Sequence, residues 1–162
     1  VRSGKSRFAE ERARATDLPV TYIATATPGD EEMAARIERH RQARPPEWNL
    51  VEEPRALGVI LEREAAPDRC LLVDCLTLWL SHVLEGAELD GQQEELLGAL
   101  ERVPGTVILV SNEVGQGVIP AEELSRRFVE AAGRLHQEVA RRCPRVTFLA
   151  AGLPWTLKGD PL

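Results

Sequence analysis

The chain has 162 residues, a length typical of one domain, and 43% of them are apolar, which is enough to form a hydrophobic core. Its 26 acidic and 20 basic residues give a net charge of -6, which disfavours binding to a nucleic-acid backbone. No apolar run approaches the roughly 20 residues of a membrane-spanning helix, and the spacing of Cys70, Cys75 and Cys143 indicates neither a disulfide framework nor a zinc site. We therefore expect one cytoplasmic domain over residues 1–162, with no nucleic-acid partner and no membrane span.

The first residues, Val1-Arg2-Ser3-Gly4-Lys5-Ser6, match the end of the phosphate-binding pattern G-x-x-x-x-G-K-[ST]. In this pattern the glycine lets backbone N–H groups point at phosphate oxygens, the lysine reaches the outer phosphates, and the serine ligates Mg²⁺ at the start of a helix. The sequence therefore predicts a helix after this loop and nucleotide binding by Arg2, Ser3, Gly4, Lys5 and Ser6. The first glycine of the pattern and the apolar strand that normally feeds it are expected upstream of Val1.

Apolar, strand-like runs alternate with amphipathic segments along the rest of the chain. We expect strands at residues 20–26, 50–51, 70–74, 106–111 and 146–151, helices at residues 30–41, 55–63, 76–84 and 121–142, and glycine-containing loops at residues 86–91 and 115–120. Continuous apolar strands separated by helices indicate a mainly parallel sheet with helices on both faces. The predicted fold class is therefore α/β, a P-loop NTPase domain.

The predicted helix at residues 30–41 carries a cationic strip around one histidine. Arg36, His40 and Arg44 recur at intervals of four residues, so they share one face, and Arg39 and Arg41 flank them. Nearby arginines disfavour the imidazolium form, which leaves a neutral, nucleophilic imidazole, and they can stabilise charge on a phosphorus under attack. The pattern predicts that Arg36, Arg39 and Arg44 bind nucleotide, and it makes a covalent intermediate on His40 chemically reasonable. The alternative is a packing or surface role for His40, and the spacing alone does not decide.

Polar residues follow two of the predicted strands, where parallel sheets bind their ligands. Asp74 ends an apolar run, as the acid that holds Mg²⁺ in P-loop enzymes does, so we expect it to hold the metal opposite Ser6. Alternatively, Asp74 caps the helix that begins near Leu76. Asn112 and Glu113 follow the strand at residues 106–111 and are expected either to face the ligand or to form a turn.

The other residues that often carry chemistry are interpreted as structural. His82 and His136 lie in helical stretches, and Trp48, Trp79 and Trp155 are too scattered to form a stacking platform, so packing is expected for each. No N-K-x-D element is present, so a guanine pocket of the GTPase type has no support.

Six short motifs occur in order along the chain: R-S-G-K-S-R at 2–7, Y-I-A-T at 22–25, D-E-E-M-A-A-R-I-x-x-H at 30–40, R-P-x-x-W at 44–48, N-E-V-G-x-G-V-I-P at 112–120 and A-G-R-L-H-Q at 132–137. In this order and combination they resemble the bifunctional adenosylcobinamide kinase / adenosylcobinamide-phosphate guanylyltransferase family of cobalamin biosynthesis. The resemblance covers essentially the whole chain.

The resemblance implies a RecA-like fold and two reactions. ATP or GTP phosphorylates the aminopropanol hydroxyl of adenosylcobinamide, and GMP is then transferred from GTP to that phosphate, which gives adenosylcobinamide-GDP and pyrophosphate. By the same resemblance, a guanylylated His40 is the intermediate, Gly4, Lys5 and Ser6 bind the triphosphate, and Asp74 takes the acidic position beside Mg²⁺. A homo-oligomer is implied as well, with a trimer as the expected form.

The choice of phosphorus separates the two reactions, because attack at γ gives the kinase and attack at α gives guanylyl transfer. Lys5 is expected to be catalytic in both, since both depend on its charge. Two alternatives stay open: a simple small-molecule kinase in which His40 only contacts phosphate, and a nucleotide-dependent switch or assembly module. The first predicts no covalent nucleotide, and the second predicts slow hydrolysis with tight partner binding.

Overall fold

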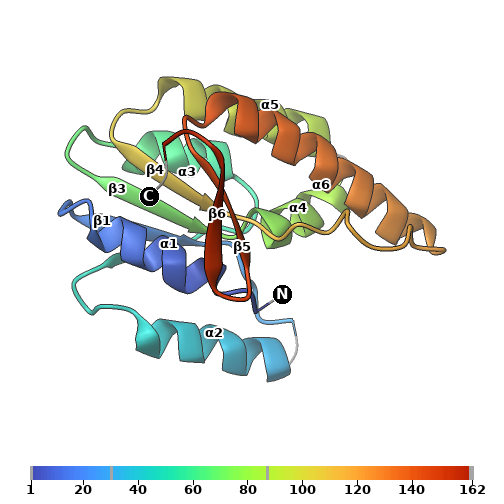
Figure 1. Ribbon diagram of the computed structural model, residues 1–162, viewed down its shortest axis with the longest axis horizontal. Coiled ribbons are helices and arrows are strands. Elements are labelled where there is room, and N and C mark those ends of the chain that lie inside the picture. Colours follow the sequence, from blue (N-terminus) through green and yellow to red (C-terminus); the bar gives the residue numbers. More distant parts are fainter. Residues whose placement is uncertain (1, 30, 87, 161–162) are drawn as a thin grey trace.

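The computed structural model describes residues 2–29, 31–86 and 88–160, and for residues 32, 33, 36, 40 and 43 it describes the backbone only. Figure 1 shows a central sheet with helices on both sides, which confirms the predicted α/β class. In chain order the elements are α1 (Lys5–Arg14), β1 (Val20–Ala24), α2 (Glu31–Ala43), β2 (Asn49–Glu52), α3 (Leu57–Glu64), β3 (Cys70–Asp74), α4 (Leu76–Leu84), α5 (Leu89–Arg102), β4 (Thr106–Val110), α6 (Glu123–Arg142), β5 (Val146–Ala150) and β6 (Leu153–Lys158).

The central sheet has four strands, all parallel, in the order β2-β1-β3-β4. Its register aligns the last residues of three strands, because Asp74 of β3 pairs with Ala24 of β1 on one side and with Val110 of β4 on the other. Parallel strands need helical or similarly long crossovers, and the helices between these strands supply them. The segments that follow β1, β3 and β4 therefore leave the sheet at one shared edge.

Alternate residues of β3 pack on opposite faces of the sheet. Cys70 and Leu72 belong to a cluster with side chains of α1, whereas Leu71 and Val73 belong to a larger cluster with side chains of α3, α4, α5 and α6. All four residues are buried, so this strand has no solvent-facing side. Burial on both faces is the physical reason for the continuous apolar run in the sequence.

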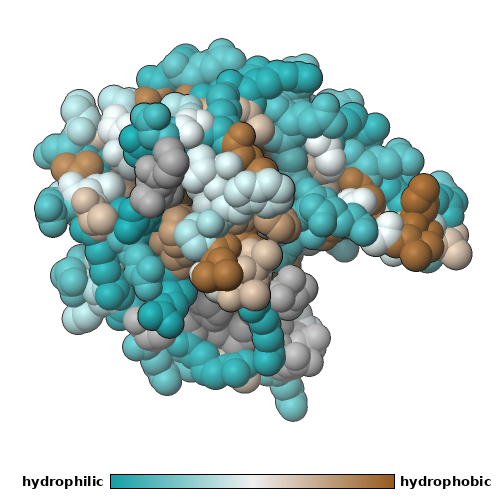
Figure 2. Space-filling model, in the orientation of Figure 1, coloured by the Kyte–Doolittle hydropathy of each residue, from teal (hydrophilic) through white to brown (hydrophobic). Residues whose placement is uncertain are grey.

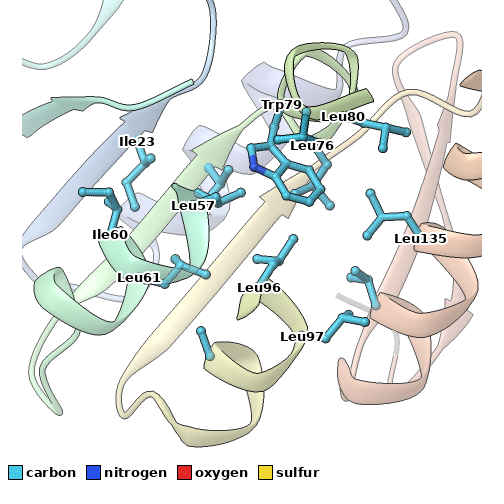
Figure 3. Close-up of a cluster of buried hydrophobic side chains, with 14 of the residues drawn as sticks. Ile23, Leu57, Ile60, Leu61, Leu76, Trp79, Leu80, Leu96, Leu97 and Leu135 are labelled. Carbon is cyan, nitrogen blue, oxygen red and sulfur yellow. The ribbon is translucent and has the colours of Figure 1, made fainter. Parts of the chain in front are cut away.

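Trp79 lies within the larger cluster and is fully buried. Figure 3 shows its indole among leucine side chains that come from the neighbouring helices. The ring nitrogen donates a hydrogen bond of 2.7 Å to the backbone carbonyl of Arg55, so burial leaves no unsatisfied donor on the indole. The packing role predicted for Trp79 is confirmed, whereas the same prediction is wrong for Trp155, whose side chain on β6 is 67% exposed.

The loop predicted at residues 86–91 is partly wrong, because α5 begins at Leu89. Leu96, Leu97 and Ala99 of this helix are buried, and the helix packs against α3 and α6. Gly91 does not interrupt it, and a Cβ at this position would meet no atom within 4 Å. The apolar side chains further along the helix therefore outweigh the weak helix propensity of glycine.

β5 does not join the central sheet as a final strand. It pairs with β6, antiparallel, in a separate two-stranded sheet. Ala151 and Gly152 connect the two strands with φ angles of 53° and 80°, and two positive φ angles are what a tight type I′ hairpin turn requires. The N–H of Gly152 donates a hydrogen bond of 3.0 Å to the carbonyl of Ser3, so this hairpin holds the segment that leads into α1.

Cys70, Cys75 and Cys143 are free thiols, and burial raises the pKa of each. In the described part of the chain, no helix has the length and apolar character that crossing a bilayer requires.

Candidate nucleotide site

The glycine before α1 has the backbone geometry of a phosphate-binding turn. Gly4 has a φ of 91°, in the left-handed region that favours glycine, and α1 begins at the next residue, Lys5. A Cβ at Gly4 would lie 3.4 Å from the backbone of Gly152, so the turn packs closely on the hairpin. Because a glycine has no capping side chain, the N–H groups of the first helical turn remain available to an anion.

A cavity of about 160 Å³ joins this turn to the segment after β4. Its lining residues are Ser3 and Lys5 from the turn, Ser111, Asn112, Glu113 and Gln116 from the segment after β4, and Thr147, Phe148 and Leu149 from β5. The structure thus brings four of the predicted site residues together: Ser3, Lys5, Asn112 and Glu113. Asn112 and Glu113, which were predicted either to face the ligand or to form a turn, thus line a cavity, and their role toward a ligand stays a prediction.

Asp74 is the last residue of β3, so it lies at the same edge of the sheet, where it contacts Tyr22 of the neighbouring strand β1. Its Oδ2 accepts a hydrogen bond of 3.1 Å from the Tyr22 hydroxyl. Burial, and after it the nearby Asp74 carboxylate, raises the pKa of Tyr22, so the phenol keeps its proton and stays a donor. The alternative that Asp74 caps α4 is wrong, because Cys75 occupies the capping position and no side chain caps this helix.

Helix α2 confirms the helix predicted at residues 30–41, and its C-terminal end is tied to β1. The guanidinium of Arg44, one residue beyond α2, lies over the Tyr22 ring at 4.3 Å from the centroid. Arg39 is exposed, and its Nε donates to a backbone carbonyl one turn earlier at 3.3 Å. The side chains of Arg36 and His40 lie outside the described part of the structure, so the cationic face predicted around His40 stays a prediction.

Three further predicted residues concern the phosphate loop and its metal. Arg2 is exposed and has a φ of 55°, and Ser6 lies, partly buried, in the first turn of α1. Within the described residues, no group of three or more His, Cys, Asp or Glu side chains could hold a metal ion. Mg²⁺ does not require such a group, because it is commonly held by one or two protein ligands together with substrate phosphates and water. Ser6 and Asp74 fit that donor set as a hydroxyl and a carboxylate, and their joint role stays a prediction.

Three residues that were not predicted as site residues, Thr77, Ser111 and His136, join Asn112 and Glu113 in a polar cluster at the end of β4, which we call the β4 polar cluster. The Ser111 Oγ lies 2.7 Å from the His136 Nε2, and the His136 Nδ1 lies 3.6 Å from a carboxylate oxygen of Glu113. From α4, the Thr77 Oγ1 lies 3.3 Å from the Ser111 Oγ and accepts a hydrogen bond of 2.7 Å from the Asn112 N–H.

One sequence signal could have pointed to this cluster. His136 directly follows Leu135 on α6, a helix whose buried residues also include Ala132 and Val139. A histidine beside the buried face of a helix needs a hydrogen-bond partner, and that partner had to be sought elsewhere in the fold.

Comparison with known proteins identifies the family. A family model described as cobinamide kinase / cobinamide phosphate guanyltransferase matches residues 1–157. The chain belongs to this family. The predicted resemblance is therefore confirmed, together with the P-loop NTPase fold class and the assignment of the protein to the transferases.

Curated relatives of the cobinamide kinase / cobinamide phosphate guanyltransferase family match this chain along nearly its whole length. The bifunctional adenosylcobalamin biosynthesis protein CobP of Pseudomonas aeruginosa is 57% identical over 165 residues, which cover 100% of this chain and 95% of that protein. The bifunctional adenosylcobalamin biosynthesis protein CobU of Salmonella typhimurium is 37% identical over 175 residues, which cover 98% of this chain and 96% of that protein. The protein of the same description from Escherichia coli is 35% identical over 174 residues, with the same two shares.

Membership of this family favours the two-reaction interpretation over both alternatives. The family description names a kinase and a guanyltransferase, which are the two activities that the motifs implied. A simple small-molecule kinase would account for one of them, and a switch module for neither.

Proposed function

We propose that this protein phosphorylates adenosylcobinamide with ATP or GTP and then transfers GMP from GTP to adenosylcobinamide phosphate, releasing pyrophosphate. The observation that carries the proposal is the cavity lined by Ser3 and Lys5 together with Asn112 and Glu113, in a chain that belongs to the cobinamide kinase / cobinamide phosphate guanyltransferase family. A single triphosphate site serves both reactions, because each attacks one phosphorus of a bound nucleotide.

In this proposal the loop before α1 binds the phosphates in both reactions. Backbone N–H groups at the start of α1 donate to phosphate oxygens, and the Lys5 ammonium balances the negative charge that moves onto the leaving group. Ser3 and Lys5 line the cavity, which supports this role. Ser6 and Asp74 would hold Mg²⁺, which when bound neutralises part of the phosphate charge.

We assign guanylyl transfer to His40. One imidazole nitrogen attacks the α-phosphorus of GTP, the bond from that phosphorus to the β-bridging oxygen breaks, and pyrophosphate leaves. A phosphate oxygen of cobinamide phosphate then attacks the same phosphorus, and the bond to histidine breaks. The position of Arg44 supports this assignment. Arg44 follows α2 and its guanidinium stacks on Tyr22 of β1, whose hydroxyl contacts Asp74, so the end of α2 is held near Asp74. Arg36, Arg39 and Arg44 would stabilise charge on the phosphorus under attack.

Labelling with GTP that carries a radioactive α-phosphate tests this assignment. His40→Ala is expected to abolish the covalent label and guanylyl transfer while phosphorylation of cobinamide largely survives, because only the transfer step needs the imidazole nucleophile. The label on the wild-type protein should be labile to acid and stable to alkali, as a histidine phosphoramidate is.

Two further variants serve as controls for this experiment. Lys5→Ala should lower both activities, because it removes a charge on which both reactions depend. Gln42→Ala changes an exposed residue of α2 that pairs with Glu38 on the same helix, and should leave both activities intact. A label retained by His40→Ala, or loss of both activities in a folded His40→Ala protein, would contradict separate roles.

The proposal includes self-association and a cytoplasmic setting. Leu153, Trp155 and Leu157 alternate along β6 and are 71%, 67% and 56% exposed, and Val118 and Ile119 are exposed in the segment between β4 and α6. Figure 2 shows apolar surface over the hairpin and at the tip of the segment that extends from the molecule. Exposed apolar surface of this kind is typical of a protein interface, which supports a homo-oligomer. The three free cysteines support a reducing, cytoplasmic environment.

A further inference from the structure

Donors and acceptors in the β4 polar cluster can be assigned so that each hydroxyl group donates its proton toward His136. The Thr77 Oγ1 accepts from the N–H of Asn112 at 2.7 Å and from its side-chain amide at 3.2 Å, so the hydroxyl proton of Thr77 is free to point at the Ser111 Oγ, 3.3 Å away. With Thr77 as that donor, we assign Ser111 as the donor to the His136 Nε2, 2.7 Å away. This assignment places the proton of the neutral imidazole on Nδ1.

Glu113 favours the same arrangement from the far side of the ring. One of its carboxylate oxygens lies 3.6 Å from the His136 Nδ1, and the other accepts a hydrogen bond from the N–H of Gly115, which fixes the carboxylate in place. An ionised carboxylate can only accept hydrogen bonds, so it favours a proton on Nδ1 and stabilises positive charge on the ring. The order Ser111, His136, Glu113 is the order of a hydroxyl, a base and an orienting acid.

The charges that face His136 are few among the described residues. Its neighbours one turn away on α6, Ala132 and Ala140, are uncharged. α4 reaches the β4 polar cluster through Thr77, and β5 lines the adjoining cavity with uncharged residues, namely Thr147, Phe148 and Leu149. On α5, which also packs against α6, Glu101 pairs with Arg142, further along α6. Glu113 is thus the carboxylate paired with the ring, and Lys5 is the cation that lines the same cavity.

The cavity links this chain of groups to phosphoryl transfer. Ser111 and Glu113 line it together with Lys5, so an alcohol bound there would lie near the triphosphate. Of the two reactions, only phosphorylation uses a neutral hydroxyl as the nucleophile, and that hydroxyl must lose its proton. In guanylyl transfer the nucleophiles are an imidazole and a phosphate oxygen, and neither needs a proton acceptor.

We infer that Ser111, His136 and Glu113 form the proton relay of the kinase reaction. The inference rests on the proposed function, because it assigns roles within the phosphoryl transfer. The oxygen of the substrate alcohol forms a bond to the γ-phosphorus, and the bond from that phosphorus to the β-bridging oxygen breaks. The alcohol proton passes to the Ser111 Oγ, the serine proton passes to the His136 Nε2, and the imidazolium is stabilised by Glu113. After release of the nucleoside diphosphate, the ring returns its proton to solvent through the same serine.

The test measures the two activities separately in the full chain. Phosphorylation is assayed with cobinamide and ATP, and guanylyl transfer is assayed with preformed cobinamide phosphate and GTP. His136→Gln keeps a hydrogen-bond acceptor for Ser111 but cannot take up a proton, so kcat of the kinase should fall by about 100-fold while guanylyl transfer stays within about twofold. Ser111→Ala should give the same split. His82→Gln is the matched control, because His82 is a second histidine whose ring nitrogen lies 3.4 Å from the Thr27 Oγ1 rather than beside Ser111.

The pH dependence of the kinase separates a relay from a structural role. The wild-type rate should fall toward acid pH, because a protonated imidazole cannot accept a proton, and this acidic limb should disappear in His136→Gln. A His136→Gln protein that keeps the wild-type acidic limb, or that loses both activities equally, would overturn the relay. An inactive wild-type kinase would instead contradict the proposed function, so the two failures can be told apart.

Discussion

Tyr22 shows how single residues set the edge of the sheet near the site. Its ring is almost fully buried, its hydroxyl donates to Asp74 at 3.1 Å, and Arg44 stacks on its face. Burial raises the pKa of Tyr22 first, and the Asp74 carboxylate raises it further. The tyrosine therefore links the end of α2 to the acidic residue that is proposed to hold Mg²⁺.

Tyr22→Phe keeps the ring and removes the titrating group. The pKa of Tyr22 in the folded state is raised above the ordinary value of 10.0, so its stabilising effect is complete below that pH and is lost as the pH rises further. We expect the free energy of unfolding to fall less steeply with pH above about 10 in the variant than in the wild type. At neutral pH the variant should lose about 1 to 3 kcal/mol, from the hydrogen bond to a carboxylate.

Urea unfolding at several pH values measures this difference. The chain has 1 tyrosine, so the ionisation of Tyr22 can also be followed directly by ultraviolet absorbance. A phenol that titrates at its ordinary pKa in the folded protein would show that Tyr22 is not held as described.

At the same scale, the sequence placed single residues through local signals. Lys5 stands at a motif position and lines the cavity, and Asp74 ends an apolar run and lies at the end of β3, while its role beside Mg²⁺ stays a prediction. The pairing of Ser111 with His136 spans 25 positions, and that of Thr77 with Ser111 spans 34, so only the tertiary fold brings these groups together. The side chain of His40 lies outside the described part of the structure, so its role stays a prediction from the motif.

At the scale of elements, a glycine allows helices α3 and α5 to pack closely against each other. Gly58 of α3 is buried, and a Cβ at this position would lie 2.7 Å from the backbone of Glu95 on α5. Real Cβ atoms do not come so close to backbone atoms, so the two helices can pack at this distance only because residue 58 has no side chain.

The same substitution at two helical glycines should therefore have opposite effects. Gly58→Ala should destabilise the protein by about 1 to 3 kcal/mol, because α3 and α5 must move apart. Gly133→Ala on α6 should stabilise it by about 0.5 to 1 kcal/mol, because no atom lies within 4 Å of the added methyl group and alanine favours a helix. Thermal and urea unfolding measure both, and shifts of the same sign would contradict the packing described at Gly58.

Elements with strong local patterns were predictable, and those decided by distant contacts were not. β3 and α4 lie where the sequence placed them, at Cys70–Asp74 and Leu76–Leu84, because a continuous apolar run and a helical spacing are local signals. β6 was missed because Pro154 interrupts its run, and proline is disfavoured inside sheets. A two-stranded sheet has only edge strands, where a proline is tolerated.

At the scale of the whole molecule, the apolar surface is uneven. The residues that β3 contributes to the sheet are covered by helices on both faces, whereas the side chains of Leu153, Trp155 and Leu157 on β6 are exposed. Covering this face with a second copy of the chain would remove the exposed area from water, which is the usual driving force of assembly.

The mass of the protein in solution tests the proposed self-association. The wild-type protein should sediment as a multiple of 17.9 kDa, and Trp155→Asp should lower the mass, because it places a charge in the apolar face. Val59→Asp is the matched control, since Val59 is an exposed valine on α3, outside the hairpin, and should leave the mass unchanged. A wild-type protein that remains monomeric at all concentrations tested would contradict the proposed oligomer.

The positions of Trp79 and Trp155 give the protein two separate optical reporters. Indole fluorescence shifts to longer wavelength in water, so Trp79, which is fully buried, reports opening of the core. Trp155, which is 67% exposed, reports the loss of water contact at the hairpin surface when subunits associate. Variants that keep one of these indoles at a time would therefore distinguish dissociation from unfolding by emission colour alone.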